Sequence, residues 1–134
     1  MPYAVEMYFD EPGTARIREM WDRLSSIGFS SMNDCGARPH VSLAVCEQLE
    51  LSTAPAIVDD FSGGVPPFEL SFSSYGLFPG AECVLFLAPK VTSLMLEKHA
   101  RFHEVISTAT DGMWAHYTPG QWVPHCTLAR AFSI

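Results

Sequence analysis

Two segments of the sequence repeat nearly the same six residues and carry side chains suited to proton transfer. They are Pro39–Ala44, which reads Pro-His-Val-Ser-Leu-Ala, and Pro124–Ala129, which reads Pro-His-Cys-Thr-Leu-Ala. An imidazole can give or take a proton near neutral pH, and a hydroxyl can donate a hydrogen bond to a phosphate oxygen. Two such pairs are a sufficient set of groups for cleaving a phosphodiester without a metal ion.

Residues that favour β-strands dominate both segments, and successive side chains of a strand point to opposite faces. His40 and Ser42 are therefore predicted to share one face, with Val41 and Leu43 on the other. The second segment repeats this alternation, with His125 and Thr127 opposite Cys126 and Leu128. Such strands would rest on a hydrophobic core and line a cleft with their polar faces.

In these features the sequence resembles the two-histidine (2H) phosphoesterases, a superfamily that includes 2'-5' RNA ligases and RNA 2',3'-cyclic phosphodiesterases. The resemblance rests on the motifs His40–Leu43 and His125–Leu128 and on their separation, 125 minus 40, or 85 residues. It implies an α+β fold of two pseudo-symmetric lobes, each with an antiparallel sheet and flanking helices, around a central cleft that holds both motifs. We expect residues 1–134 to form a single domain of this kind.

The resemblance also implies an enzyme, a hydrolase of the cyclic phosphodiesterase or 2'-5' RNA ligase type that opens 2',3'-cyclic phosphates on nucleotides or RNA ends. One of His40 and His125 would deprotonate water and the other would protonate the leaving alkoxide, and the sequence does not assign the two roles. Ser42 and Thr127 would donate hydrogen bonds to the non-bridging oxygens, where negative charge is held in the transition state. No metal ion and no organic cofactor is expected, because the sequence has neither a convincing ligand set nor a glycine-rich nucleotide motif.

The charge of the chain limits the kind of substrate. Its formal net charge is −7, from 8 basic and 15 acidic residues, which argues against a protein that grips long duplex nucleic acid. Two of the few arginines, Arg38 and Arg130, flank the histidine motifs and are candidate phosphate ligands. Arg38 would share the face of His40 if the strand includes Pro39, whereas alternation places Arg130 on the face opposite His125. A small nucleotide or an RNA end is therefore the expected partner.

The sequence also predicts a compartment. No segment approaches the roughly 18 to 20 apolar residues of a membrane-spanning helix, and the N-terminus lacks the basic start of a signal peptide. We therefore expect a soluble, cytoplasmic protein that does not bind a membrane. Without a C-x-x-C pair, all four cysteines are expected to be reduced. Three of them lie in apolar runs and would act as small hydrophobic residues: Cys46, Cys83 and Cys126. The sequence carries no signal for an oligomeric state.

Hydrophobic periodicity predicts an interspersed series of strands and helices. Strands are expected at residues 2–9, 40–46, 68–77, 83–88 and 125–132, and helices at 14–27, 53–61 and 92–109. Polar turns are expected around Asn33 and over residues 111–120. Connections of this kind favour an antiparallel or mixed sheet over a doubly wound parallel one.

Two other functions stay open at this point. A domain of the same fold could bind a nucleotide without turnover, although the presence of all four motif side chains argues against it. A metal-dependent hydrolase could use His99 and His103, which stand four residues apart in a predicted helix. That pair lacks the neighbouring glutamate of zinc proteases and has no cysteine pair to complete a site, so a solvated helix face is the favoured interpretation.

Overall fold

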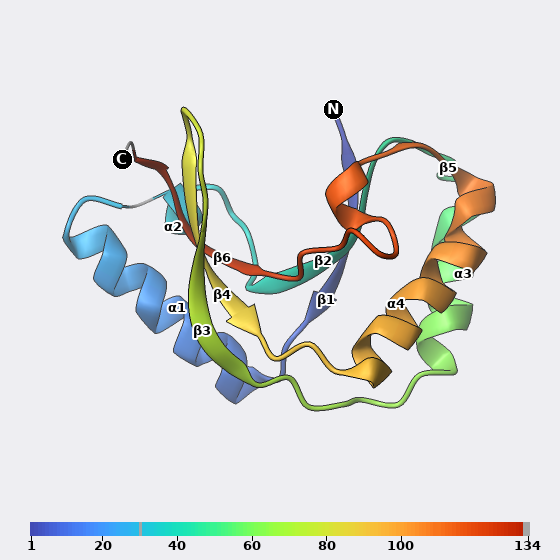
Figure 1. Cartoon of the computed structure of the whole chain (residues 1–134), viewed down its shortest axis with the longest axis horizontal. Helices are drawn as coiled ribbons and strands as arrows, with labels where there is room; N and C mark the ends of the chain where they lie inside the picture. Colours follow the sequence, from blue (N-terminus) through green and yellow to red (C-terminus); the bar gives the residue numbers. More distant parts are fainter. Residues whose placement is uncertain (30, 133–134) are drawn as a thin grey trace. The chain divides into compact units, whose positions relative to one another are not determined.

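The strands form two three-stranded sheets, with strand orders β1-β2-β5 and β3-β4-β6 (Figure 1). The structure is a computed structural model, and it describes residues 1–29 and 31–132. Within these residues the strands are β1 (Tyr3–Tyr8), β2 (His40–Leu49), β3 (Phe72–Phe78), β4 (Cys83–Pro89), β5 (Thr110–Met113) and β6 (Cys126–Phe132). The helices are α1 (Glu11–Ser26), α2 (Ser31–Asp34), α3 (Ala54–Gly63) and α4 (Ser93–Ile106). The expected α+β class with antiparallel sheets is confirmed, and none of these helices is both long and apolar enough to cross a membrane.

The chain divides into two compact units, and each is assembled from separate stretches of sequence. Unit 1 comprises Met1–Glu6, Ser42–Ser71 and Lys90–Pro124, and unit 2 comprises Met7–Val41, Phe72–Pro89 and the residues from His125 on. Unit 1 therefore holds β5, α3 and α4, and unit 2 holds the sheet β3-β4-β6 with α1 and α2. Strands β1 and β2 each continue from one unit into the other.

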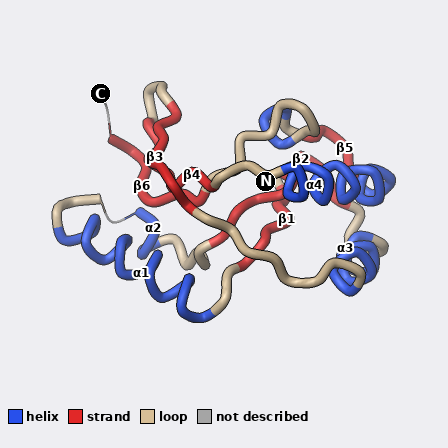
Figure 2. The backbone as a smooth tube through the Cα atoms, turned by 60° about the horizontal axis from the view of Figure 1, so that its bottom comes forward, coloured by secondary structure: helices blue, strands red, loops and turns tan. Residues whose placement is uncertain are grey.

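Helix α1 begins at Glu11, earlier than the start at residue 14 that the apolar periodicity predicts, because the Asp10 side chain caps its N-terminus. The Asp10 side chain accepts a hydrogen bond from the Gly13 backbone N–H at 2.8 Å, and Pro12 lies in the first turn, where no backbone donor is needed. The helix ends before Gly28, whose φ of +106° is rare for other residues. Trp21 is among its buried side chains, and the helix packs on β6 (Figure 2).

The sheet of unit 2 is antiparallel, with Gly76 opposite Phe86 and Phe86 opposite Thr127. Facing residues of neighbouring strands lie on the same side of a sheet, so these three residues form one row across it. Strand β3 begins at Phe72, four residues later than the alternation predicts, because the pairing with β4 starts only there. The short helix α2 replaces an expected polar turn and also packs on β6.

Helices α3 and α4 lie side by side in unit 1 and cover its hydrophobic core (Figures 1 and 2). The buried core residues come from β2, both helices and the turn after α4: Ala44, Ala54, Phe102, Ile106 and Ala109. Phe61 of α3 and Phe102 of α4 meet edge to face, with ring centres 5.2 Å apart. The predicted helix over residues 92–109 is α4 followed by a 3-10 turn, η1 (Ser107–Ala109).

Strand β5 lies where the sequence predicts only a turn. It is four residues long, too short for an alternating pattern to be visible. It pairs with β2 in the register Cys46 opposite Met113, and its third residue, Gly112, has a φ of +68°. A Cβ atom at Gly112 would lie 2.9 Å from the Cβ of Glu47, so this close approach of the two strands requires glycine.

Candidate active site

The two predicted histidines lie in the same unit. Unit 2 contains five of the six predicted site residues: Arg38, His40, His125, Thr127 and Arg130. The sixth, Ser42, is the first residue of the middle stretch of unit 1. His40 opens β2, whereas His125 immediately precedes β6 instead of lying inside it as the sequence predicts. Both histidines are partly buried, and Thr127 is buried.

The imidazole of His40 is oriented by the backbone of Arg38. Its Nδ1 atom lies 2.6 Å from the Arg38 carbonyl oxygen. A carbonyl only accepts hydrogen bonds, so Nδ1 carries a hydrogen in the neutral ring as well as in the protonated one. Any proton that His40 takes up or releases therefore moves through Nε2. The Arg38 guanidinium lies over the ring of Tyr8, 4.1 Å from its centre, and this contact helps to hold the residue whose carbonyl orients the imidazole.

The backbone of His40 lies against Cys126, the chain neighbour of His125. Burial raises the pKa of the Cys126 thiol to about 11, and a hydrogen bond with the His40 backbone opposes this shift. The thiol is therefore protonated and inert at neutral pH. The expected role of Cys126 as a small hydrophobic residue is confirmed, since it is buried. Its hydrogen bond with the His40 backbone brings the two motifs together within unit 2.

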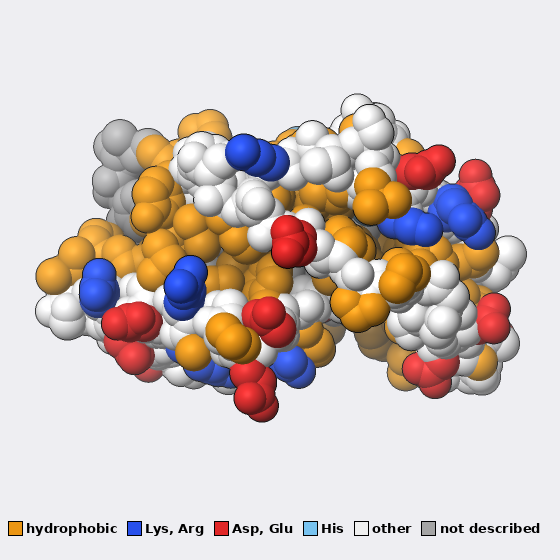
Figure 3. Space-filling view, turned by 90° about the horizontal axis from the view of Figure 1, so that it is seen from below, with side chains coloured by type: hydrophobic (Ala, Val, Ile, Leu, Met, Phe, Trp, Pro, Cys, Tyr) orange, Lys and Arg blue, Asp and Glu red, His pale blue; other side chains and the backbone are white. Residues whose placement is uncertain are grey.

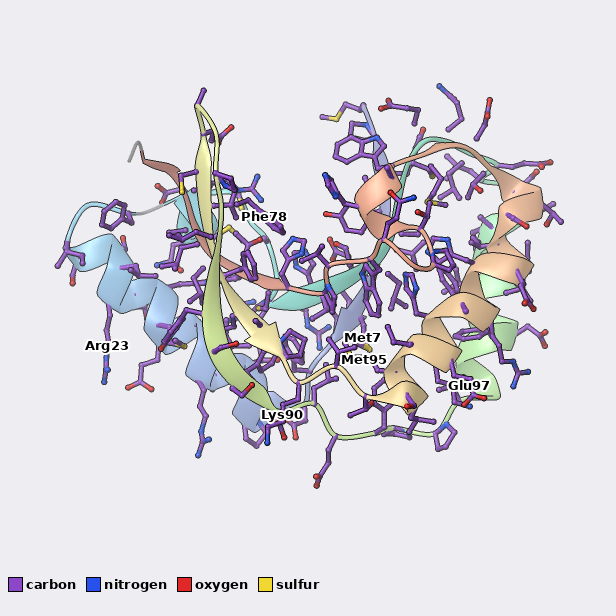
Figure 4. All side chains as sticks on the ribbon, viewed as in Figure 1. Met7, Arg23, Phe78, Lys90, Met95 and Glu97 are labelled. Atoms are coloured by element: carbon purple, nitrogen blue, oxygen red, sulfur yellow. The ribbon has the colours of Figure 1, made fainter. Side chains whose placement is uncertain are left out.

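The imidazole of His125 packs against two phenylalanine rings. Its centre lies 4.8 Å from that of Phe78 on β3 and 5.4 Å from that of Phe86 on β4. The contact with Phe78, which is labelled in Figure 4, is edge to face, an arrangement that aromatic rings favour. The ring of Phe86 extends across Gly76, where a Cβ atom would overlap its Cζ and Cε2 atoms. Gly76 therefore makes room for the ring that supports His125.

Replacing Gly76 with alanine is expected to displace the Phe86 ring. Such overpacking typically costs about 1–3 kcal/mol of unfolding free energy, and turnover should also fall because His125 loses part of its support. Adding Phe86→Leu should restore the missing space, so the double variant should be more stable than Gly76→Ala alone. Gly63→Ala is the matched control, because a Cβ there meets open space. Urea unfolding measures all four proteins, and equal stability of Gly76→Ala and the natural chain would contradict the prediction.

A β-bulge in β6 changes the face on which Arg130 lies. Thr127 is opposite Phe86 and Arg130 is opposite Val84, so β6 contains one extra residue between the two pairs. Simple alternation placed Arg130 on the face opposite the motif histidine, and this prediction is wrong. Val84 and Phe86 share one side of β4, and the bulge therefore returns Arg130 to the side of Thr127. The two residues within the bulge are both buried: Leu128 and Ala129.

The backbone carbonyl of each hydroxyl residue accepts a hydrogen bond from a tryptophan. In unit 2, Trp21 Nε1 donates to the Thr127 carbonyl at 3.1 Å. In unit 1, Trp122 Nε1 donates to the Ser42 carbonyl at 3.2 Å. Trp21 is 1% exposed and Trp122 is 9% exposed, so little water competes for either bond. The two motifs are thus anchored in the same way by tryptophans from different parts of the chain.

Two histidines of α4 share one acceptor, the carbonyl oxygen of Leu43. It lies 3.0 Å from Nε2 of His99 and 2.8 Å from Nε2 of His103. On the same edge of β2, the carbonyl of Val45 accepts from the backbone N–H of Trp114, at the end of β5. The two imidazoles therefore supply donors to β2 just beyond the point where its neighbouring strand ends.

The predicted solvated face of α4 is wrong, because His99 and His103 are only 2% and 9% exposed. His99 stacks on Trp122, with ring centres 3.8 Å apart and an angle of 2° between the planes. Burial and the nearby His103 lower the pKa of His99 to about 4, although hydrogen bonds with the Leu43 and Tyr117 backbones act against this shift. Among the described residues, no group of three or more His, Cys, Asp and Glu side chains could hold a metal ion. The histidine pair is therefore assigned to the support of β2.

A comparison with protein-family models places these features in a known family. The matching model is described as the 2'-5' RNA ligase superfamily, and it covers residues 12–131, which include both histidine motifs. The chain belongs to the 2'-5' RNA ligase superfamily. The relationship to the 2H phosphoesterases that the paired motifs indicated is thereby confirmed. No match was found among curated proteins.

Membership in the 2'-5' RNA ligase superfamily supports a phosphoesterase-like or ligase-like function. Three residues that support the motifs were not identified from the sequence: Trp21, Phe86 and Trp122. Most aromatic residues of a small domain lie in its core, so their type alone did not mark them. The position of Trp122, three residues before His125, was the one available signal.

The exposed charges of α1 in this superfamily member are mixed in sign. Arg23 and Glu19 form an ion pair at 3.7 Å, and both side chains are well exposed. Figure 3 shows basic and acidic side chains interspersed on the face it draws, and Figure 4 shows Arg23 pointing outward from α1. This face lacks the continuous basic surface with which proteins neutralise the phosphates of a duplex.

Proposed function

We propose that the protein is a metal-independent phosphodiesterase that opens 2',3'-cyclic phosphates on nucleotides or RNA ends. The observation that carries this proposal is the pair of histidine-hydroxyl motifs within a chain of the 2'-5' RNA ligase superfamily. The orientation of His40 supports it, because the hydrogen bond from Nδ1 to the Arg38 carbonyl leaves Nε2 as the atom that exchanges protons. The packed environment of His125 supports it further, because a general acid or base must be held in a defined orientation.

The proposed reaction needs one proton removed and one proton supplied. One histidine takes a proton from water as the oxygen attacks phosphorus, and the other gives a proton to the ribose oxygen as its bond to phosphorus breaks. The products are an opened phosphomonoester and a free ribose hydroxyl. When this reaction runs in reverse, the cyclic phosphate closes and water is released, and His40 and His125 exchange their roles. In a ligation, the hydroxyl of a second RNA end would take the place of water as the attacking group.

The reaction also requires groups that stabilise the negative charge on the phosphate. We assign the hydroxyls of Ser42 and Thr127 as hydrogen-bond donors to the non-bridging oxygens, with Arg38 and Arg130 as the nearby positive charges. The face shared by Thr127 and Arg130 supports the assignment of the latter. With a net charge of −7, the protein is expected to act on small nucleotides or RNA ends and not on long duplexes.

Turnover is expected to survive EDTA. The measurement is hydrolysis of 2',3'-cyclic nucleotides, of RNA ending in a 2',3'-cyclic phosphate and of 2'-5'-linked oligonucleotides, each with and without chelator. Opening of a cyclic phosphate at an unchanged rate in EDTA would support the proposal. A loss of activity that one divalent ion restores would reject the mechanism, and nucleotide binding without any product would favour a binding domain of the same fold.

A further inference from the structure

The tryptophans bound to the two motifs form an equivalent pair. Each donates its indole N–H to the backbone carbonyl of the residue that carries the motif hydroxyl, Thr127 for Trp21 and Ser42 for Trp122. The two bonds differ by only 0.1 Å, at 3.1 Å and 3.2 Å, although Trp21 comes from α1 and Trp122 from a loop. If the two tryptophans only filled space in a core, they would not both need to bind the corresponding residue of each motif.

Each of these tryptophans is itself held in place. Trp21 is buried at 1% exposure, and the guanidinium of Arg18 lies 5.8 Å from the centre of its ring. Trp122 stacks on His99, whose Nε2 atom binds the carbonyl of Leu43, the residue next to Ser42. In unit 1 the peptide groups on both sides of Leu43 are therefore each bound by a side chain, through the carbonyls of Ser42 and Leu43.

The position of a backbone carbonyl decides where the hydroxyl of the same residue can lie. In Ser and Thr only one bond separates Cα from the carbon that bears the hydroxyl. A displacement of the backbone therefore displaces the hydroxyl by a similar distance. Hydrogen bonds weaken steeply when their distance or angle departs from the optimum. Donors that hold charge in a transition state are effective only when they are positioned in advance.

We infer that Trp21 and Trp122 are positioning residues, which fix the hydroxyls of Thr127 and Ser42 for phosphate binding through their carbonyl groups. This inference rests on the proposed function of the two hydroxyls. Neither indole needs to touch the substrate. Loss of an indole N–H should therefore weaken the stabilisation of the transition state while substrate contacts elsewhere persist.

The test replaces each tryptophan with phenylalanine or with β-(3-benzothienyl)alanine, which keeps the shape of the indole and has sulfur in place of its N–H. The benzothienyl variants separate the hydrogen bond from packing if Trp21→Phe fails to fold. We expect kcat on a cyclic-phosphate substrate to fall about tenfold for each, with little change in KM. Trp114 is the matched control, because its Nε1 binds the exposed side chain of Glu47, and its variants should retain full activity.

A double-mutant cycle distinguishes positioning from general damage. In a Ser42→Ala background the Trp122 substitution should cause no further loss, and the same should hold for the Trp21 substitution in a Thr127→Val background. Losses that multiply in these backgrounds, or equal losses for Trp114, would overturn the inference.

Binding of inorganic phosphate provides a readout that does not depend on turnover. Titration followed by NMR should show weaker phosphate binding in the Trp21 and Trp122 variants and unchanged binding in the Trp114 variants. If the natural chain opens no cyclic phosphate but this difference is present, the proposed function fails and the positioning role stands. If phosphate binding is unchanged in all variants, the positioning role is rejected.

Discussion

His40→Ala and His125→Ala are each expected to lower turnover of a cyclic phosphate by about 10²- to 10⁴-fold, the usual contribution of a positioned general acid or base. Both side chains are only partly buried, so their removal should leave the fold intact. The double variant should lose much less than the product of the two single losses, because the two groups act in one concerted reaction. Steady-state rates and far-UV circular dichroism of the three variants measure these effects.

The same variants can show which histidine is the general acid and which is the general base. Turnover against pH should be bell-shaped, because one imidazole must be neutral and the other protonated. A substrate whose leaving group needs no protonation should restore much of the rate to the variant that lacks the acid and little to the variant that lacks the base. His116→Ala is the control, because His116 is exposed and has no assigned role. Near-natural activity of both single motif variants would refute the catalytic assignment.

Acidification from pH 7 to pH 4 is expected to destabilise the fold through His99. Burial lowers the pKa of His99 to about 4 in the folded protein, whereas an unfolded histidine has a pKa of about 6.5. Between these values the unfolded chain binds a proton that the folded chain does not, so the free energy of unfolding falls as the pH falls. The contribution of this one residue is at most about 3 kcal/mol, fully present above pH 6.5 and lost towards pH 4.

Urea unfolding at intervals between pH 7 and pH 4 measures this contribution. His99→Gln keeps an amide donor for the Leu43 carbonyl and removes the titration, so its stability should depend less on pH than that of the natural chain. The control, His116→Gln, changes an exposed histidine and should keep the natural dependence. Identical pH dependence in the natural chain and His99→Gln would exclude His99 as the cause.

The parts of the site that the sequence could predict are those set by short-range patterns. The spacing of two residues between histidine and hydroxyl, and the helix around Trp21, follow from local sequence. The side on which Arg130 lies could not be predicted, because a bulge depends on how β6 pairs with β4 and has no signal in β6 alone. The burial of His99 was equally hidden, because a polar residue in a helix is taken as exposed unless its distant acceptor, here the carbonyl of Leu43, is known.

The order of the chain through the two units constrains how the protein can be made. The stretches of the units alternate along the sequence, so the chain crosses between the units five times, at the boundaries after residues 6, 41, 71, 89 and 124. During synthesis on a ribosome, one edge of β4 remains unpaired until β6 has been synthesised. His125 follows the last of the five boundaries, so it joins unit 2 last. A chain cut between the two motifs would therefore contain neither unit in complete form. Expression of the halves as separate polypeptides should yield activity only if they are present together and associate.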